Sequence, residues 1–410
     1  MKSNYKPIGN YIRLVDERNK GLKHTNLLGV SISKQFIPSV ANIIGTDMEN
    51  YKIIRKNQFA CSTMQVRRDK KMPVALYLEN EPSIISQAYP IFEIINIEEL
   101  LPEYLMMWFT RSEFDREACF NAVGGVRGSL EWEDFCNMQL PIPSIEKQKE
   151  IIKEYHILVN RIDLNNQLVA KLEETAQAIY KQWFVDFEFP DENGLPYKSN
   201  GGEMEFCEEL DMEIPVGWEN KKIIDLCICN SSTLSSKDNF TTIEYLDTSN
   251  ITNNEIGELQ ILNIKEDEIP SRAKRKVKHN DIIFSTVRPN LKHFGILKDI
   301  NENMIVSTGF AVLSVSNINL CSEIVYLTIT GNDNLSSLQA KAEMSVSTYP
   351  SIKPEDLLNL DFLLPNLNVL NLANTIFIST FSLLGNLQKE TKKLETLKTL
   401  LLSKIATLNN

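Results

Sequence analysis

The chain has few of the residues that build metal sites or disulfide frameworks. Seven cysteines are scattered over 410 residues, none of them in a Cys-x-x-Cys pair, and there are only four histidines. This usage indicates reduced thiols and excludes a zinc finger. Gly-x-Gly-x-x-Gly and Gly-x-x-x-x-Gly-Lys-Ser/Thr are also missing, so neither a dinucleotide cradle nor a P-loop is expected.

Long hydrophobic runs are lacking as well. No segment approaches the roughly 18 consecutive apolar residues of a membrane span, and residues 1–19 have no apolar signal core. The net charge of −11 excludes a uniformly basic coat for nucleic acid but not a local basic face. With 43% hydrophobic residues, the chain can bury ample core. We expect a cytoplasmic protein of two or three domains, without a membrane partner.

A catalytic constellation is hard to find. The Asn-Pro-Pro-aromatic and Asp-Pro-Pro-aromatic tetrapeptides of base methyltransferases are absent. Asp191, Glu219 and Lys221 formally match a nuclease pattern, but they lie in a segment rich in glycine and proline rather than on adjacent strands. No catalytic constellation is therefore visible in the sequence, and a Mg²⁺-dependent nuclease is the enzyme alternative.

The sequence contains an internal repeat. Four short motifs occur twice in the same order, at nearly constant offsets such as 285 − 62 = 223 for Ser62 and Ser285 and 351 − 129 = 222 for Ser129 and Ser351. The paired segments are 57–63 with 280–286, 83–89 with 304–310, 129–135 with 351–357, and 140–143 with 362–365. We therefore predict two similar globular parts, which mix short strands (84–85, 91–95, 281–285, 310–315) with short helices (102–109, 354–358).

A long amphipathic helix is predicted after each globular part. In residues 151–183, nine of ten a and d heptad positions are apolar or aromatic, which is typical of a coiled-coil seam. A poorer seam follows in residues 376–408. Asn165 and Glu390 occupy the third d position of each helix, where a buried polar residue often fixes register. The alternative is that Glu390 lies at the edge of the seam.

These patterns predict an α+β architecture. Two domains of mixed strands and short helices are separated by two long helices, which pack as an antiparallel coiled coil under a pseudo-two-fold axis. Each seam would form a rod of about 50 Å that could separate two recognition sites. The predicted parts are 1–145 (domain 1), 146–187 (helix 1), 188–213 (a loop or linker rather than core), 214–365 (domain 2) and 366–410 (helix 2).

Basic residues cluster despite the acidic net charge. Cations follow the repeated Ser-Thr in both copies, and Arg suits guanine edges and phosphates while Lys suits phosphates. A second candidate element is the loop 124–129, whose glycines would allow close approach to DNA. Solvated surface runs and a plain turn are the competing interpretations. The candidate DNA-binding residues are Arg67, Arg68, Lys70, Lys71, Arg127, Arg272, Lys274, Arg275, Arg288, Lys292 and Lys341.

Further segments resemble one known family. Residues 140–148 (Leu-Pro-Ile-Pro-Ser-Ile-Glu-Lys-Gln), 179–190 (Ile-Tyr-Lys-Gln-Trp-Phe-Val-Asp-Phe-Glu-Phe-Pro), 201–204 (Gly-Gly-Glu-Met) and 214–218 (Ile-Pro-Val-Gly-Trp) are similar to the specificity (S) subunit of type I restriction–modification systems. The resemblance covers essentially the full chain. The second copy departs from it, because residues 365–370 lack the Glu-Lys-x-x-Glu helix entry.

The resemblance implies a non-catalytic subunit, not an enzyme, with two target-recognition domains that each read half of a bipartite double-stranded DNA target. It also implies two modification (adenine methyltransferase) subunits and restriction subunits as partners. S-adenosylmethionine, ATP and Mg²⁺ would bind to those partners, and this chain would hold no cofactor or metal. The alternative of a different class is a two-headed protein-interaction scaffold that does not bind DNA.

Overall fold

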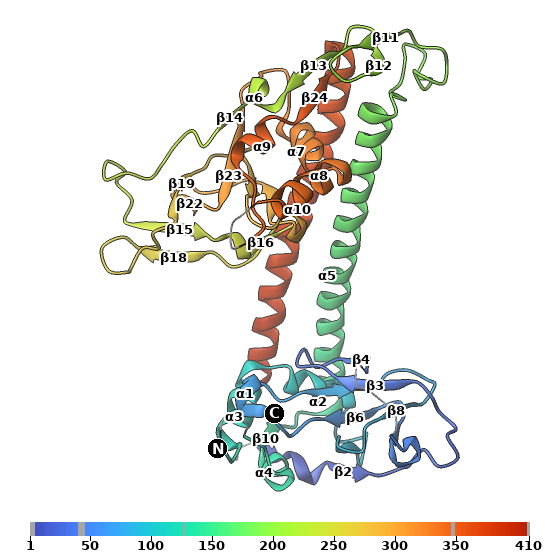
Figure 1. The fold of residues 1–410 in the computed structure, drawn as a ribbon. Helices are drawn as coiled ribbons and strands as arrows, with labels where there is room; N and C mark the ends of the chain where they lie inside the picture. The colour runs from blue at the N-terminus through green and yellow to red at the C-terminus, as the bar shows by residue number, and fades with distance from the viewer. Residues whose placement is uncertain (1–4, 40–45, 126–127, 346–348, 408–410) are drawn as a thin grey trace. The chain divides into compact units, whose positions relative to one another are not determined.

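The structure is a computed structural model that describes residues 5–39, 46–125, 128–345 and 349–407. The chain forms two compact units. Unit 1 comprises Met1–Leu164 and Thr391–Asn410, and unit 2 comprises Asn165–Glu390. Two long helices, α5 (Ile145–Tyr180) and α10 (Leu367–Ile405), contribute to both units (Figure 1).

Unit 1 contains three small sheets and four short helices. All strand pairs are antiparallel except β3 with β8, which is parallel. The sheets, in strand order, are β1 (Tyr5–Pro7) and β10 (Gln139–Pro141); β2 (Ile12–Val15), β9 (Ile91–Ile94), β6 (Gln58–Cys61) and β7 (Val74–Leu76); and β4 (Phe36–Pro38), β3 (Leu27–Val30), β8 (Ser83–Ile85) and β5 (Lys52–Ile54). The helices are α1 (Val66–Asp69), α2 (Pro102–Phe109), α3 (Ser112–Asn121) and α4 (Trp132–Asn137), with 3-10 turns at Ile8–Asn10 and Met48–Asn50.

Unit 2 contains the same three sheets. The strand orders are β13 (Glu219–Lys222) and β24 (Asp361–Leu364); β14 (Cys227–Cys229), β23 (Phe310–Val315), β20 (Ile282–Ser285) and β21 (Phe294–Ile296); and β18 (Gln260–Asn263), β15 (Thr242–Leu246), β22 (Met304–Ser307) and β19 (Ala273–Lys276). Its helices are α6 (Ile223–Leu226), α7 (Ser322–Thr330), α8 (Asn332–Glu343) and α9 (Pro354–Leu358), with 3-10 turns η4 (Thr248–Asn250) and η5 (Pro289–Leu291). Two hairpins are added, β11 (Met204–Cys207) with β12 (Met212–Pro215), and β16 (Ile251–Thr252) with β17 (Glu255–Ile256).

The predicted repeat is confirmed by this topology. The order β2-β9-β6-β7 in unit 1 matches β14-β23-β20-β21 in unit 2, element by element along the sequence. The second sheet also agrees in its single parallel pair, β3 with β8 and β15 with β22. Short helices follow each sheet pair in the same order, and two of them, Pro102–Phe109 and Pro354–Leu358, have the predicted bounds. The proline at the first turn of each explains this agreement, because proline is preorganised for that position.

Aromatic side chains fill the cores of both units. In unit 1, the Phe59 and Phe92 rings stack at 4.9 Å between centroids, and Phe109 packs edge-on against both. In unit 2, the Phe284 and Phe294 rings of β20 and β21 stack at 5.3 Å. These buried rings fix the strand ends, and the candidate binding residues follow directly after them.

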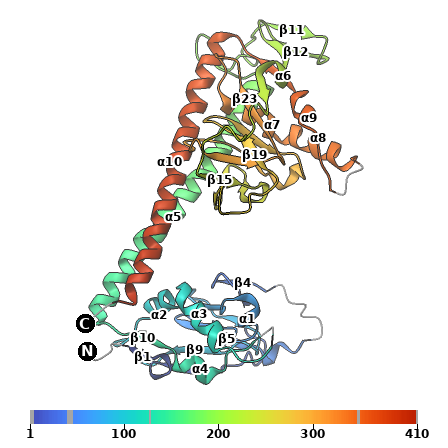
Figure 2. The same ribbon diagram turned by 90° about the vertical axis from the view of Figure 1, so that its left-hand side faces the viewer.

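The two long helices pack against each other within each unit (Figure 2). In unit 1, Ile151 of α5 and Ile405 of α10 belong to one core. In unit 2, Asn165 Nδ2 donates to Glu390 Oε2 at 3.2 Å, and the ring of Phe184, one turn beyond α5 in a π-helical turn (Lys181–Val185), contacts that of Phe377. These contacts run in opposite chain directions, so the helices are antiparallel.

The predicted seam of α5 matches the burial, whereas the d positions of α10 are one residue out of phase. Leu383 and Leu397, expected at d positions, are about half exposed, while Leu384 and Ile405 are buried. Several consecutive leucines in α10 made both phases possible. Glu390 consequently lies beside the seam, at its half-buried edge, and Asn165 lies fully buried within it.

Helix α10 is long and apolar enough by composition to cross a membrane, which the search for uninterrupted apolar runs missed. Its apolar side chains have another place in the fold. Leu370, Ala373, Phe377 and Phe381 are buried in the core of unit 2. These four side chains therefore form a face of α10 that packs inside unit 2.

The segment predicted as a loop rather than core, 188–213, is in part core. Phe189 and Cys207 are buried, and the Phe189 ring stacks on Trp218 at 5.2 Å. The β11–β12 hairpin lies in the same segment. The glycines and prolines of this segment led to the prediction of a loop. They mark turns, however, whether or not the residues between the turns are buried.

Candidate nucleic-acid interface

The same backbone feature follows equivalent strands in the two units. In unit 1, α1 lies between Gln65 and Lys70, which have left-handed φ values of +65° and +52°. In unit 2, η5 lies between Arg288 and Lys292, at +50° and +56°. We call these two segments, residues 64–71 and 287–292, the cationic turns. Left-handed conformations are unfavourable for residues other than glycine, so their pairwise repetition indicates a shared and specific geometry.

A second segment lies against each cationic turn. The backbone N–H of Leu130 donates to the carbonyl of Thr63 at 2.9 Å, and that of Ile352 donates to Thr286 at 2.9 Å. Each donor directly follows the repeated serine, Ser129 or Ser351. The loop that the sequence analysis singled out, 124–129, therefore lies beside the first cationic turn. Of this loop, Arg127 lies outside the described residues.

The two arginines of the first cationic turn are held by different partners. Arg67 Nη1 donates to the Gly124 carbonyl at 3.1 Å, and its aliphatic stem fills the space in which a Cβ on Gly128 would lie, 2.8 Å from Arg67 Cβ. Arg68 forms a two-pronged ion pair with Asp69, at 2.7 and 3.1 Å. The Asp69 carboxylate raises the pKa of Arg68, and Arg68 lowers the pKa of Asp69. Lys70 and Lys71 are exposed beside them.

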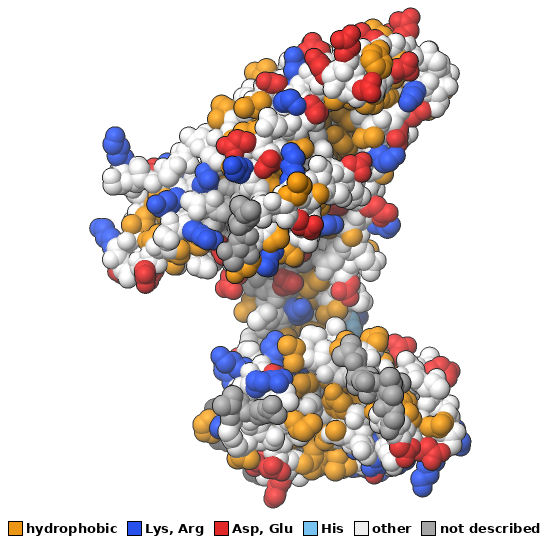
Figure 3. All heavy atoms as spheres, viewed as in Figure 1, with side chains coloured by type: hydrophobic (Ala, Val, Ile, Leu, Met, Phe, Trp, Pro, Cys, Tyr) orange, Lys and Arg blue, Asp and Glu red, His pale blue; other side chains and the backbone are white. Residues whose placement is uncertain are grey.

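In unit 2, the cations are spread over a broader surface. The guanidinium of Arg288 lies 4.9 Å from the centre of the exposed Tyr349 ring, and its backbone N–H donates to the Pro350 carbonyl at 2.9 Å. Lys292 is exposed at the end of η5. Lys341, at the end of α8, lies 3.7 Å from Asp356. Figure 3 shows Lys and Arg side chains on the side of unit 2 that carries β15, β18 and β19.

The basic run of β19 is only partly available to a ligand. Arg272 and Lys274 are exposed, and β19 is the edge strand of its sheet. Arg275 is half-buried, and its Nε has no hydrogen-bond partner among the described residues. Lys276 pairs with Asp238. The exposed members of this run are therefore the ones that can reach a polyanion.

Comparison with known proteins decides the family. The model of the type I restriction modification DNA specificity domain matches residues 41–174 and 215–399, which is most of the chain. The chain belongs to this specificity family. The resemblance drawn from the sequence is therefore confirmed.

Two curated specificity subunits and one solved structure agree with this. The HindI specificity subunit of Haemophilus influenzae is 24% identical to this chain over 127 residues, which are 31% of this chain and 27% of that protein. The MjaIX subunit of Methanocaldococcus jannaschii is 30% identical over 136 residues, 32% of this chain and 29% of that protein. The chain thus spans less than a third of either relative. A crystal structure of the type I S subunit from M. genitalium shares the fold, with 13% identity, a TM-score of 0.58, and coverage of 99% of this chain and 96% of that one.

Specificity subunits of type I systems are non-catalytic, so the family confirms the prediction that this chain is not an enzyme. The nuclease alternative also lacks geometric support. Asp191 Oδ1 accepts hydrogen bonds from the backbone N–H groups of Asn193 and Leu195, both at 2.8 Å. These bonds lower the pKa of Asp191 and engage its carboxylate within its own turn. Glu219 pairs with Lys221 at 2.8 Å. Within the described ranges, no cluster of three His, Cys, Asp or Glu could hold a metal.

Two positioning features of this specificity protein escaped the sequence analysis. In unit 1, Asp115 Oδ1 accepts the Met72 backbone N–H at 3.1 Å and pairs with the buried Lys34 at 2.7 Å, which fixes the chain leaving the first cationic turn. In unit 2, the Asn290 backbone N–H donates to Gln339 Oε1 at 3.1 Å and anchors η5 to α8. No sequence pattern signals either contact, because the partners are far apart in the chain.

A hairpin joins the second cationic turn to α5. Residues 31–35 alone connect β3 and β4, whereas residues 247–259 connect β15 and β18 and include the β16–β17 hairpin. The Asn253 backbone N–H donates to the Lys292 carbonyl at 2.7 Å, and Asn253 Nδ2 donates to Glu173 Oε2 at 3.0 Å. Burial of the Glu173 carboxyl, together with repulsion from Glu255, raises its pKa to about 7.

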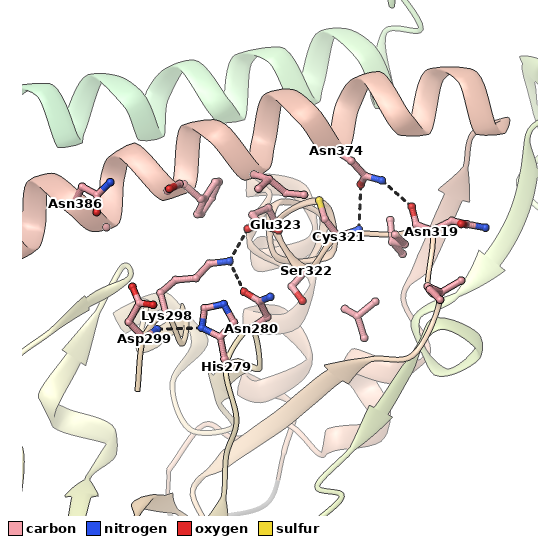
Figure 4. A pocket seen from close by; sticks show the side chains of 17 residues that line it. His279, Asn280, Lys298, Asp299, Asn319, Cys321, Ser322, Glu323, Asn374 and Asn386 are labelled. Carbon is pink, nitrogen blue, oxygen red and sulfur yellow. Dashed lines mark hydrogen bonds and ion pairs between the residues drawn. The ribbon is translucent and has the colours of Figure 1, made fainter. Parts of the chain in front are cut away.

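A cavity of about 660 Å³ in unit 2 lies beside α10 (Figure 4). Several of its polar groups pair with one another. Lys298 Nζ pairs with the buried Glu323 at 2.6 Å, and Asn374 of α10 accepts the Cys321 backbone N–H at 3.1 Å while donating to the Asn319 carbonyl at 2.7 Å. The cavity walls thus connect α10 to the sheets, and we assign them a structural role.

Proposed function

We propose that this chain is the DNA-recognition subunit of a type I restriction–modification complex and reads a bipartite double-stranded target, one half with each unit. The observation that carries the proposal is the cationic turn. A strained turn that bears exposed cations follows the equivalent strand of both units, with a second loop held against it by the same backbone hydrogen bond. Two equivalent readers suit a target of two parts.

The remaining parts of the proposal concern the assembly. Residues 1–145 and 214–365 would be the two target-recognition domains, joined through residues 146–187, 188–213 and 366–410. The antiparallel helices would set the unread gap between the half-targets. Two methyltransferase subunits and the restriction subunits would dock on this chain in the cytoplasm. They would supply S-adenosylmethionine, ATP and Mg²⁺ chemistry, and also much of the phosphate-binding surface, which is compatible with the acidic charge of this chain.

The first test removes cations from both turns. The assembled complex with Arg67, Arg68, Arg288 and Lys292 replaced by alanine should lose target binding, and the dependence of log affinity on log salt should weaken by roughly one unit for each phosphate contact removed. The matched control replaces Arg13 and Lys222 by alanine. Both are exposed and ion-paired like Arg68, but they lie on β2 and β13. Unchanged binding by the four-residue variant would favour a protein-interaction scaffold instead.

The second test addresses the two-part target. Residues 1–143 are exchanged for the corresponding segment of another family member, and the methylated-adenine motif is mapped in genomic DNA. One half of the motif should change while the other half and the gap stay constant. A change in both halves would contradict the assignment of one half-target to each unit.

A further inference from the structure

The two cationic turns differ in the residue that opens them. Gln65 comes three residues after Ser62, and Arg288 comes three residues after Ser285, at the same point of the repeat. Both have left-handed φ values, +65° and +50°. Each carbonyl accepts a bond that closes its turn, from the N–H four residues on in the first turn (Asp69, 3.0 Å) and three residues on in the second (Leu291, 2.9 Å). The two backbones therefore present different side chains from the same position.

The chemistry of these two side chains matches different bases. The side-chain amide of glutamine pairs with the N6 and N7 edge of adenine in the major groove, whereas a guanidinium pairs in two-pronged fashion with O6 and N7 of guanine. Gln65 is partly exposed, and its side chain makes no hydrogen bond to any residue that the structure describes. Arg288 is exposed, and Tyr349 supports its guanidinium face at 4.9 Å, while its guanidinium N–H groups make no hydrogen bond to the residues that the structure describes.

We propose that Gln65 and Arg288 are the equivalent base-reading residues of the two units, with Gln65 reading adenine and Arg288 reading guanine. Tyr349 is a positioning residue that orients the Arg288 guanidinium. The inference rests on the proposed function, which it refines by naming one base in each half-target.

The neighbouring arginines are less suited to this role. Arg67 uses one N–H group on the Gly124 carbonyl, and the guanidinium of Arg68 is occupied on two sides by Asp69. Both can still contact phosphate through their remaining N–H groups. Base reading and phosphate contact are thus assigned to different residues of the same turn.

The test maps the methylated-adenine motif in cells that express the chain with its methyltransferase subunit. Arg288→Gln should replace one guanine by adenine in the half-target of unit 2, and Gln65→Arg should replace one adenine by guanine in the other half. In binding to the purified complex, each change should alter the preference between the two bases by about 10- to 100-fold. Tyr349→Ala should weaken the guanine preference, and Tyr349→Phe should retain it.

Glycine variants keep the test independent of folding. Glycine adopts positive φ without strain, so Arg288→Gly and Gln65→Gly preserve the turn and remove only the side chain. Each should leave methylation active with one position relaxed. Methylation with an unaltered motif, or its complete loss in the glycine variants, would overturn this inference while the proposed function stands. A wild-type complex that methylates or binds no specific sequence would instead refute the proposed function itself.

Discussion

The buried ion pair of unit 1 allows a quantitative prediction. Lys34 lies in the turn between β3 and β4, and its side chain is 6% exposed. Its ammonium group binds the Phe109 carbonyl and Asp115 Oδ1, and the same Asp115 oxygen accepts the Met72 N–H. Burial lowers the pKa of Lys34, and the Asp115 carboxylate opposes that shift. Lys34→Met therefore leaves a buried carboxylate with a single hydrogen bond.

Removing one partner of a buried pair costs about 3–5 kcal/mol. Because the Met72 N–H still compensates part of the Asp115 charge, we expect the lower end, about 3 kcal/mol, for Lys34→Met. Asp115→Asn should cost a similar amount, since the amide oxygen can still accept from Lys34 but the buried ammonium loses the negative charge that compensates it. The double variant removes both charges and should cost clearly less than the sum of the two, with a coupling of about 1–3 kcal/mol.

Hydrogen exchange measured by mass spectrometry resolves the stability of unit 1 from that of unit 2. It is therefore suited to comparing the two single variants with the double variant. Arg13→Met is the control, because the Arg13–Glu93 pair is short, at 2.6 Å, but exposed, and should contribute less than about 1 kcal/mol. A loss below about 1 kcal/mol for Lys34→Met, or strictly additive single and double variants, would refute the reasoning.

Three further predictions concern the helices and the first turn. The raised pKa of Glu173 means that the folded state binds this proton more tightly than the unfolded chain does, so the stability that the group provides is present below about pH 4 and is lost as pH rises through about 7. Glu173→Gln should therefore raise the free energy of unfolding at pH 8 by about 1–2 kcal/mol after allowance for solvent screening, measured as a higher melting temperature, and leave it unchanged at pH 4. Asn165 Oδ1 is buried and has no hydrogen-bond partner in the described part of the chain, so replacing Asn165 and Glu390 together by leucine should raise the calorimetric midpoint of unfolding; a lowered midpoint would contradict this. Gly128→Ala should weaken target binding at least severalfold in a titration of the assembled complex, because Gly128 has a φ of +44° and its new Cβ would collide with Arg67. Gly21→Ala is the control: Gly21 has a φ of +74° but open space around it, so the variant should strain its loop without affecting binding.

Local patterns in the sequence predicted the order of the elements well. The strand Phe310–Val315 and the helices after Leu101 and Lys353 have the predicted bounds, because apolar runs and prolines mark them directly. The repeat also placed the cationic turns correctly at the ends of equivalent strands. Nothing in the family or fold comparisons tests the individual DNA-binding residues, which stay predictions.

Contacts between distant segments could not be predicted. The d phase of α10 was ambiguous because leucines occur at 383 and 384, and only the folded structure shows that the second is the buried one. Gln65 escaped notice because nothing in a glutamine signals a left-handed backbone; its offset from Ser62, equal to that of Arg288 from Ser285, was the available clue. The Lys34–Asp115 pair spans 81 residues and leaves no local pattern.

The hairpin that carries Asn253 has a consequence for inheritance. The Asn253 side chain donates a hydrogen bond to Glu173, which is encoded upstream of the whole second domain. The Asn253 backbone donates to the second cationic turn, which we propose contacts DNA. A gene segment for a new second domain that arrives by recombination brings its own hairpin but not the carboxylate at 173. Lineages that acquire new specificities through this half should therefore show paired replacements at the two positions.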